Sequence, residues 1–367
     1  MECFGRQGQT ELTQDGLRRL RIEAPDEQSY RRVRQRWDGI AKPLDGLGRM
    51  EELIARIGAI TRTADVALRK KALLILCADN GITEEGVSQC SASVTRAVAC
   101  SMGKGESPAG RMARAAGAVS IPVDIGMLGQ EPVEGVLDRK VRCGTENFRK
   151  RPAMERQEAL CAIGTGIALV RELRDKGFDL LALGEMGIGN TTTSSAVAAA
   201  LLGRSAEETV GRGAGLDDAG LERKRCVIRE ALETYGLYRA DALTVLRTVG
   251  GLDIAGLAGA CIGGALFHIP IVLDGVISLT AALAAERLVP GTREYLLPSH
   301  LGREPAAAWL LRELGMEPVL HADLALGEGT GAVMLFPLLE LTLSVYGSGA
   351  TFSGIQVEQY RRWEKEQ

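Results

Sequence analysis

Four short apolar segments recur along the chain, and each ends in Asp or Gly at a predicted turn. They cover residues 72–81, 119–126, 179–187 and 269–275. Apolar residues dominate each segment without regular polar alternation, which is typical of strands buried on both faces of a parallel sheet. We therefore expect four parallel strands whose carboxyl ends lead into loops.

Alanine-rich amphipathic stretches between these segments predict helices, among them residues 191–203 and 241–266. Strands that alternate with helices indicate an α/β fold, here a Rossmann-like parallel sheet flanked by helices. In such sheets ligands bind outside the carboxyl ends of the strands. We therefore expect the sequences ADNG, GEMGIGN and LDG, which follow three of the strands, to share one rim.

The two ends of the chain have a different pattern. Residues 30–61 are predicted to be helical on both sides of a break at residues 43–48, and helix is predicted again in 340–352 and 358–366. We expect a small helical domain formed by residues 1–60 and 340–367, and a large α/β catalytic domain of residues 61–339.

Composition narrows the class of protein. Of 367 residues, 46% are hydrophobic and 25% charged, the balance of a globular protein with a core. A net charge of -3 and only 4% aromatic residues argue against a nucleic-acid partner. The first thirty residues are polar, and no run of eighteen apolar residues occurs, so neither a signal peptide nor a membrane span is expected.

Eight cysteines are present, and no two of them form a C-x-x-C pair. Several, such as Cys77 and Cys261, lie inside apolar runs, where a free Cys behaves as a small hydrophobe. We expect reduced, buried thiols and therefore a cytoplasmic protein.

The strongest local motif is LALGEMGIGNTTTSSAV at residues 181–197. Glu185 follows a strand, and Gly187 and Gly189 then open a helix rich in hydroxyl groups. Backbone N–H groups at such a helix start, together with Asn190 and Thr191, are suited to hold an anion. No Lys follows the glycines, so this is not a Walker A loop. A glycine turn that merely caps a helix is the alternative.

Two further glycine-rich segments carry charged residues. In GRGAGLDDAGLERK (211–224), Asp217 and Asp218 have the pattern of an N-cap, and Lys224 alone is more often a solvated helix charge than a ligand-binding one. In DLALGEGTGAVMLFPLL (323–339), Glu328 lies between two glycines before an apolar helix. It fits a dipole-stabilising cap or a base whose pKa is raised in a dry pocket equally well.

Two smaller segments are expected on the same rim. LPSHLGREP (297–305) offers Ser299, His300, Gly302 and Arg303, and IVLDGVIS (271–278) offers Asp274. With only three histidines and no G-x-S-x-G elbow, neither a histidine metal site nor a serine hydrolase is expected. The chemistry then rests on carboxylates, glycine backbone and hydroxyls, which suits phosphate binding and stabilisation of positive charge on a sugar.

Taken together, the motifs resemble the nicotinate-nucleotide–dimethylbenzimidazole phosphoribosyltransferase family from about residue 30 to 360. KPLDGLGRMEEL (42–53), ADNGITEEGVS (78–88), GEMGIGNTTTSSA, GRGAGLDDAGLERK, GGLDIAGLAGA, LDGVIS, SHxxxEP and LGEGTGA follow the family order. The resemblance implies transfer of the 5-phosphoribosyl group of nicotinate mononucleotide to a cobamide lower-ligand base such as 5,6-dimethylbenzimidazole. The products are α-ribazole 5′-phosphate and nicotinate.

The resemblance also implies roles for individual residues. Glu328 is expected to be the general base, Glu185 to support the positively charged sugar or position the nucleotide, and Lys224 to neutralise anionic substrate groups. No metal or other cofactor is implied, and a homodimer is expected. The Ala/Gly-rich residues 249–266 indicate close helix packing within or between subunits. The expected substrate-binding residues are Gly187, Gly189, Asn190, Thr191, Gly213, Ala214, Gly215, Asp274, Ser299, Gly302 and Ser88.

The chain departs from the family pattern in a cluster. Residues 90–95 (CSASVT) and 103–113 (GKGESPAGRMA) differ near the expected lower-base pocket, while Asn80 replaces the commoner His and Gly46 the usual Ser. These changes leave the acceptor open among benzimidazoles, purines and phenolics. A low-activity paralogue that acts as a partner subunit or nucleotide-binding regulator is the main alternative. The joint presence of Glu185, Lys224 and Glu328 argues against it.

Overall fold

A computed structural model describes residues 12–362 of the chain, so Cys3 lies outside the described residues. The strands of this part form one six-stranded sheet in the order β3-β2-β1-β4-β5-β6, and every neighbouring pair is parallel. The strands are β1 (Lys71–Ala78), β2 (Ala118–Gly126), β3 (Leu137–Asp138), β4 (Leu180–Met186), β5 (Ile271–Leu273) and β6 (Leu296–Pro298).

The four strands predicted from the apolar segments are β1, β2, β4 and β5, so the α/β prediction is confirmed. The order of the strands reverses direction between β1 and β4, which are adjacent although other elements separate them in sequence. At such a point the loops that leave neighbouring strands diverge and open a crevice for a ligand. A ligand site is therefore expected where ADNG follows β1 and GEMGIGN ends β4.

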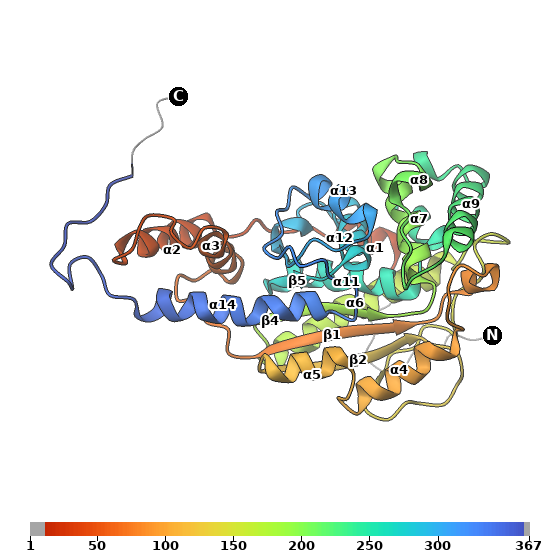
Figure 1. Cartoon of the computed structure of the whole chain (residues 1–367), viewed down its shortest axis with the longest axis horizontal. Helices are drawn as coiled ribbons and strands as arrows, with labels where there is room; N and C mark the ends of the chain where they lie inside the picture. The colour runs from red at the N-terminus through yellow and green to blue at the C-terminus, as the bar shows by residue number, and fades with distance from the viewer. Residues whose placement is uncertain (1–11, 363–367) are drawn as a thin grey trace.

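Helices cover both faces of the sheet (Figure 1). In β1, Ala72, Leu74 and Leu76 belong to one buried core, whereas Leu73 and Ile75 belong to the other, because successive side chains of a strand point to opposite faces. The first core lies against α6 (Arg156–Asp175), α7 (Asn190–Leu202), α11 (Leu252–Phe267) and α12 (Val276–Leu288). The second lies against α3 (Arg49–Thr61), α4 (Ser93–Gly103), α5 (Pro108–Ala115) and α14 (Thr330–Ser348).

The remaining helices lie around these two layers. They are α1 (Gln14–Arg19), α2 (Glu27–Gly39), α8 (Ala206–Thr209), α9 (Asp218–Thr234), α10 (Ala242–Val249) and α13 (Pro305–Leu314), with short 3₁₀ turns η1 (Gly81–Glu85), η2 (Leu237–Arg239) and η3 (Thr292–Tyr295).

Two helix predictions were wrong in detail. The stretch 241–266 is two helices, α10 and α11, separated by extended backbone at Gly250 and Gly251. The predicted helix at 358–366 is absent from its described part, residues 358–362. That charged segment is too short to be a stable helix without an apolar face to bury, and Arg362 instead pairs with Asp38 and Asp45.

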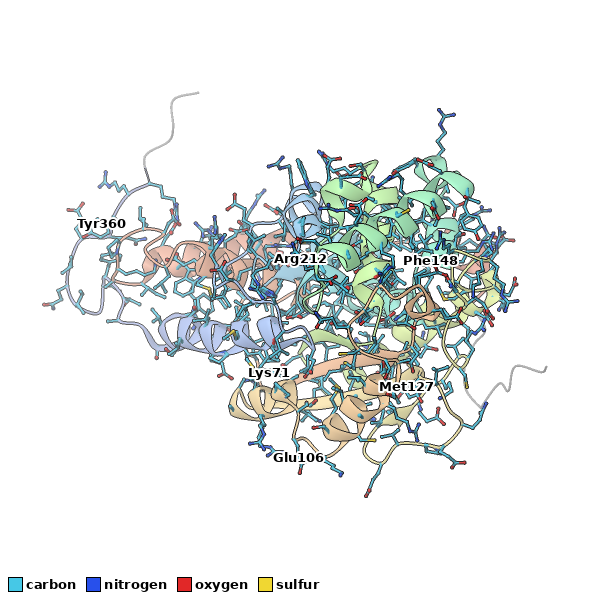
Figure 2. The ribbon with its side chains drawn as sticks, turned by 45° about the vertical axis from the view of Figure 1, so that its right-hand side comes forward. Lys71, Glu106, Met127, Phe148, Arg212 and Tyr360 are labelled. Carbon is cyan, nitrogen blue, oxygen red and sulfur yellow. The ribbon has the colours of Figure 1, made fainter. Side chains whose placement is uncertain are left out.

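Helices α2 and α3 and the C-terminal segment lie together at one side of the molecule (Figure 1), where Tyr360 lies on the extended tail far from Phe148 and Met127 (Figure 2). There α2 packs on α3, and α14 runs back along α3 (Figure 1). Ile40 also forms an antiparallel bridge with Thr351. Leu17 of α1, by contrast, is buried in the core beside α6. The domain boundaries at residues 60 and 340 stay a prediction.

Two expectations about the chain's environment can be compared with the described residues. Helix α14 is long and apolar enough to cross a membrane, but half of it is buried within the fold, as in a core helix. The seven described cysteines form no disulfide bond with one another. Cys77 and Cys261 are buried as expected, whereas Cys90 is exposed and the other four are half-buried.

Candidate active site

The predicted rim exists, because Asn80, Glu185, Asp274 and Ser299 lie at the carboxyl ends of β1, β4, β5 and β6 in a parallel sheet. The loop of Glu328 crosses the same edge. A Cβ atom built on Gly184 of β4 would lie only 2.4 Å from the carbonyl oxygen of Glu328. Glycine at position 184 therefore allows the backbone of Glu328 to pass directly over β4, beside Glu185.

Glu328 has an unusual backbone conformation. Its φ angle is +61°, and both flanking glycines also have positive φ. A residue with a side chain pays about 1–3 kcal/mol for such a conformation, which persists where the surrounding structure enforces it. Strain of this kind clusters at functional sites.

The carboxylate of Glu328 faces helix α5. Its Oε2 accepts a hydrogen bond of 3.4 Å from the backbone N–H of Ala109 in the first turn of α5. Burial raises the pKa of Glu328, the N–H of Ala109 opposes that shift, and the negative charge of Asp274 adds to it. A half-buried carboxylate with a raised pKa is suited to accept a proton near neutral pH.

Asp274 performs the capping that was considered for Glu328. Its Oδ1 accepts the N–H of Ala332 at 3.0 Å and its Oδ2 the N–H of Gly329 at 3.3 Å, both in the first turn of α14. The structure therefore does not support a simple cap role for Glu328. Because both Asp274 oxygens are engaged with backbone, its direct contact with substrate stays a prediction.

Glu185 and Asp253 are joined by Asn190, the first residue of α7. The Nδ2 of Asn190 donates to Glu185 Oε2 and, at 3.2 Å, to Asp253 Oδ2. Desolvation by the surrounding protein and repulsion from Asp253 raise the pKa of Glu185 to about 8, against the amide of Asn190. Burial raises the pKa of Asp253 to about 7. Asp253 did not stand out in the sequence as a site residue.

Lys224 is fully buried on α9, so the expectation that such a Lys is solvated was wrong. Its Nζ donates to Thr191 Oγ1 at 2.9 Å and to the carbonyl of Gly211 at 3.2 Å. Burial lowers the pKa of Lys224 to about 8, and the charge of Glu304 opposes that shift. The lysine thus links the start of α7 to the second glycine loop.

Glu304 holds the same glycine loop from the other side. Its Oε1 accepts the N–H of Gly213 at 3.0 Å, while its Oε2 is buried and makes no hydrogen bond. Ala214 and Gly215 are exposed on the loop, and the side chain of Gln89 donates to the carbonyl of Gly215. The half-buried Ser88 is therefore close to this loop, as a shared site requires.

The other residues predicted to bind substrate also lie on the rim. Ser299 Oγ is 2.6 Å from the carbonyl of Leu273 and 2.9 Å from His300 Nδ1, so its hydroxyl is already engaged. Gly302 follows in the loop after β6. Gly187 and Gly189 pack closely on Asn80 at the end of β1. Substrate contacts of these residues stay predictions.

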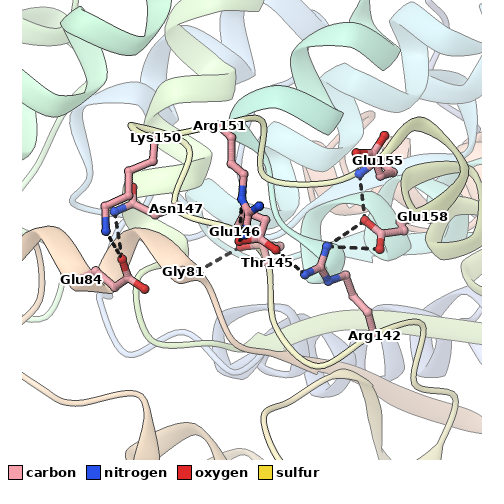
Figure 3. A network of polar contacts seen from close by, with 10 residues as sticks. All are labelled: Gly81, Glu84, Arg142, Thr145, Glu146, Asn147, Lys150, Arg151, Glu155 and Glu158. Atoms are coloured by element: carbon pink, nitrogen blue, oxygen red, sulfur yellow. Dashed lines mark hydrogen bonds and ion pairs between the residues drawn. The ribbon is translucent and has the colours of Figure 1, made fainter. Parts of the chain in front are cut away.

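The loop after β1 is anchored by residues 142–158 (Figure 3). Thr145 Oγ1 accepts the N–H of Gly81 at 3.1 Å. Lys150 forms a 2.7 Å ion pair with Glu84 in η1. Arg142 in turn bridges Glu146 and Glu158. This network fixes Asn80 against the start of α7.

The divergent segment 103–113 forms the wall beside Glu328. Ser107 caps α5 by accepting the N–H of Gly110 at 3.1 Å, and Pro108 occupies the first turn. The next residue, Ala109, donates to Glu328. The sequence departures at 103–113 therefore touch the expected base directly, which the sequence alone did not reveal.

The arrangement brings together the expected Glu328, Glu185, Asn190, Thr191 and Lys224. The residues that sequence reasoning missed are Asp253, Glu304 and Ala109, each of which contacts a member of this set or its glycine loop. The motifs GGLDIAGLAGA and SHxxxEP contained the first two as a signal. A raised-pKa base, a carboxyl pair and a buried lysine around glycine loops suit transfer of an anionic sugar phosphate.

Comparison with known proteins points to the same family as the sequence motifs. A family model described as Phosphoribosyltransferase matches residues 22–357. The nicotinate-nucleotide–dimethylbenzimidazole phosphoribosyltransferase of Acetivibrio thermocellus is 45% identical and covers 90% of this chain and 94% of its own length. That of Ruminiclostridium cellulolyticum is 41% identical, with 95% and 98% covered. The crystal structure of the Thermus thermophilus enzyme of the same description has a TM-score of 0.85 at 38% identity, covering 91% and 100%.

Proposed function

The chain belongs to the nicotinate-nucleotide–dimethylbenzimidazole phosphoribosyltransferase family, and on that premise we propose Glu328 as the general base of its reaction. The enzyme transfers the 5-phosphoribosyl group of nicotinate mononucleotide to a ring nitrogen of the lower-ligand base. One C–N bond forms at the anomeric carbon while the bond to nicotinate breaks, and its electron pair goes to the pyridine nitrogen.

The observation that carries this role is the position of the Glu328 carboxylate. It is half-buried, it accepts a hydrogen bond from the N–H of Ala109 in α5, and its loop crosses the end of β4 beside Glu185. A raised pKa favours uptake of the N–H proton of a benzimidazole as its other ring nitrogen attacks. Attack on the face opposite nicotinate inverts the anomeric centre from β to α.

The other charged groups fit complementary tasks. Glu185 lies beside the Glu328 loop, where a carboxylate would stabilise positive charge that develops on the sugar. Lys224, which links the two glycine loops through Thr191 and Gly211, is suited to the anionic phosphate.

The variant Glu328→Gln tests the assignment of the base. Because Gln keeps the shape but cannot take up a proton, turnover should fall by about 10²–10⁴-fold while nicotinate mononucleotide still binds. Stopped-time product analysis and calorimetric titration measure the two quantities separately. Normal turnover by this variant would show that another group is the base.

The acceptor is tested with a panel of benzimidazoles, purines and phenols, with products identified by mass. We expect an α-ribotide with 5,6-dimethylbenzimidazole or a close relative, because an N–H acid is what Glu328 can deprotonate. A product with phenols alone would assign the oxygen-linked reaction. Nucleotide binding without any product would support a partner-dependent or regulatory paralogue.

We also propose a cytoplasmic homodimer. The seven described cysteines form no disulfide bond with one another, which suits a reducing compartment. The Ala/Gly-rich helix α11 packs against α6 of the same chain, so it is occupied within the subunit. The support for a dimer comes instead from α14, where Met334 and Leu341 are 41% and 66% exposed on one face of the helix.

A further inference from the structure

Asp253 is a fully buried acid whose place in the site has no assigned task. It lies in the first turn of α11, where its Oδ1 accepts the N–H of Ile254 at 2.9 Å. Its Oδ2 accepts from the same Asn190 amide that donates to Glu185. One amide group therefore ties together two carboxyl groups that come from β4 and α11.

The surroundings of this pair are acidic. Both carboxyl groups are desolvated, and each of them has a raised pKa. Lys224 approaches the pair through Thr191, which is next to Asn190. Its Nζ donates hydrogen bonds to Thr191 and to the carbonyl of Gly211. No cation is among the main influences on either acid. The charged or titratable groups that face the pair are Asp79 after β1, Cys77 in β1 and Asp274 after β5, while Glu328 donates to Glu185 through its backbone N–H.

A buried acceptor lies near the pair. The Oδ1 of Asn80 is buried and makes no hydrogen bond with the described residues. It lies on the same side of Gly251 as Asp253 Oδ1, because a Cβ atom built on Gly251 would be 2.5 Å and 2.4 Å from the two oxygens. A buried acceptor without a donor is costly. A proton on Asp253 Oδ1 would therefore be favoured by this neighbour.

We propose that Asp253 is a positioning residue, which with Asn190 holds Glu185 and keeps one proton on the Glu185–Asp253 pair at neutral pH. The pair then meets the substrate with one negative charge. A doubly ionised pair would repel the anionic nucleotide, whereas a single charge still stabilises a positively charged sugar. The role of the pair toward substrate rests on the proposed function, but its shared proton is a property of the ligand-free protein.

The first test is titration of the ligand-free protein by NMR with ¹³C-labelled Asp and Glu carboxyl groups. Loss of a negative neighbour stabilises the remaining carboxylate, so Asp253→Asn should lower the pKa of Glu185, and Glu185→Gln that of Asp253. We expect each change to alter the protonated-to-ionised ratio by on the order of tenfold. The control Asp241→Asn removes another helix-capping carboxylate, which accepts from Thr244 at 3.0 Å, and should shift neither group.

The second test is the affinity for nicotinate mononucleotide between pH 7 and 9. The wild-type affinity should weaken as pH rises, in part because both acids of the pair become ionised. Asn mimics a protonated Asp, so Asp253→Asn should lose that part of the weakening, up to about tenfold. Asp241→Asn should behave as the wild type. Two results would overturn the proposed pair. One is that Glu185 and Asp253 titrate in the wild type with ordinary carboxyl pKa values. The other is that neither Asp253→Asn nor Glu185→Gln shifts the pKa of the remaining acid. Absent turnover with any acceptor would instead overturn the proposed function and leave the NMR result valid.

Discussion

Lys224 illustrates how much one buried charge can control. Its ammonium group has no exposure to solvent, and among the described residues it donates to two acceptors, Thr191 and the carbonyl of Gly211. A lysine has three N–H groups, and we propose that the third binds an incoming anion. Because burial lowers its pKa to about 8, Lys224 is protonated at neutral pH but loses its charge in mild alkali.

Binding of nicotinate mononucleotide should therefore depend on the protonation of Lys224. Between pH 7 and 9 the protonated fraction falls by about tenfold for a pKa near 8, and affinity should fall with it. The variant Lys224→Met should bind weakly throughout, so its difference from the wild type should shrink as pH rises. Calorimetric titration at several pH values measures both. Since Lys224→Met retains Glu185 and Asp253, a constant difference would contradict the role of Lys224.

At the scale of single residues, the sequence indicated which side chains to expect in the site, but not how deeply they are buried or which groups they contact. Glu328, Glu185 and Lys224 were expected in the site from the resemblance. Burial of Lys224 depends on the packing of α9 against α7, which no local pattern encodes. Asp253 looked like part of an apolar helix, and its link to Glu185 appears only when α7 and α11 meet over β4.

The element that positions the base is the loop over the end of β4. A Cβ atom at position 184 would meet the carbonyl oxygen of Glu328 at 2.4 Å and the N of Gly329 at 3.0 Å. Both partners are backbone atoms, so they cannot rotate away as a side chain can. A larger residue at 184 must lift the loop and move the carboxylate of Glu328.

Gly184→Ala is therefore expected to lower kcat on the order of 10²-fold, because a displacement of about 1 Å can have that effect. Binding of the nucleotide should change less, since Lys224 and the glycine loops lie elsewhere. The matched control is Gly39→Ala, at a glycine with nothing within 4 Å of the added carbon. Steady-state kinetics with a circular-dichroism check of folding decide the matter, and unchanged kcat for Gly184→Ala would refute the contact.

Strands that belong to a long apolar segment were predicted, and the others were missed. β1, β2, β4 and β5 each overlap such a segment, although β5 itself has three residues. β3 has two residues and β6 three, and neither belongs to an apolar segment of that kind. The break between α10 and α11 was missed because the apolar character continues through Gly250 and Gly251. The tail at 358–362 was predicted as helix from composition, but its contacts are ion pairs with Asp38 and Asp45.

For the whole molecule, the unpartnered face of α14 bears on assembly. Met334, Pro337 and Leu341 follow at helical spacing, and all three are exposed. Because contiguous exposed apolar patches mark interaction sites, we propose this face of α14 as the dimer contact. The same helix begins just after Glu328, so a contact on α14 would also stabilise the loop of the base.

Leu341→Glu should convert the proposed dimer to monomer, because it places a charge in an apolar contact at a side chain that is 66% exposed within one chain. Light scattering after size-exclusion chromatography measures the mass. Tyr238→Glu is the control, since Tyr238 is 44% exposed in η2. A wild-type mass equal to one chain, 39.2 kDa, would rule out the dimer.

The cap that Asp274 provides has an evolutionary consequence. Because Asp274 accepts the N–H groups at the start of α14, Glu328 is not needed to cap that helix. Its carboxylate is therefore available for the proposed reaction. A duplicated copy could lose Glu328 without unfolding, and would inherit the loops that surround the nucleotide. One substitution at Glu328 could therefore produce an inactive relative that still binds the ligand. In such relatives Asp274 should be retained even where Glu328 is lost.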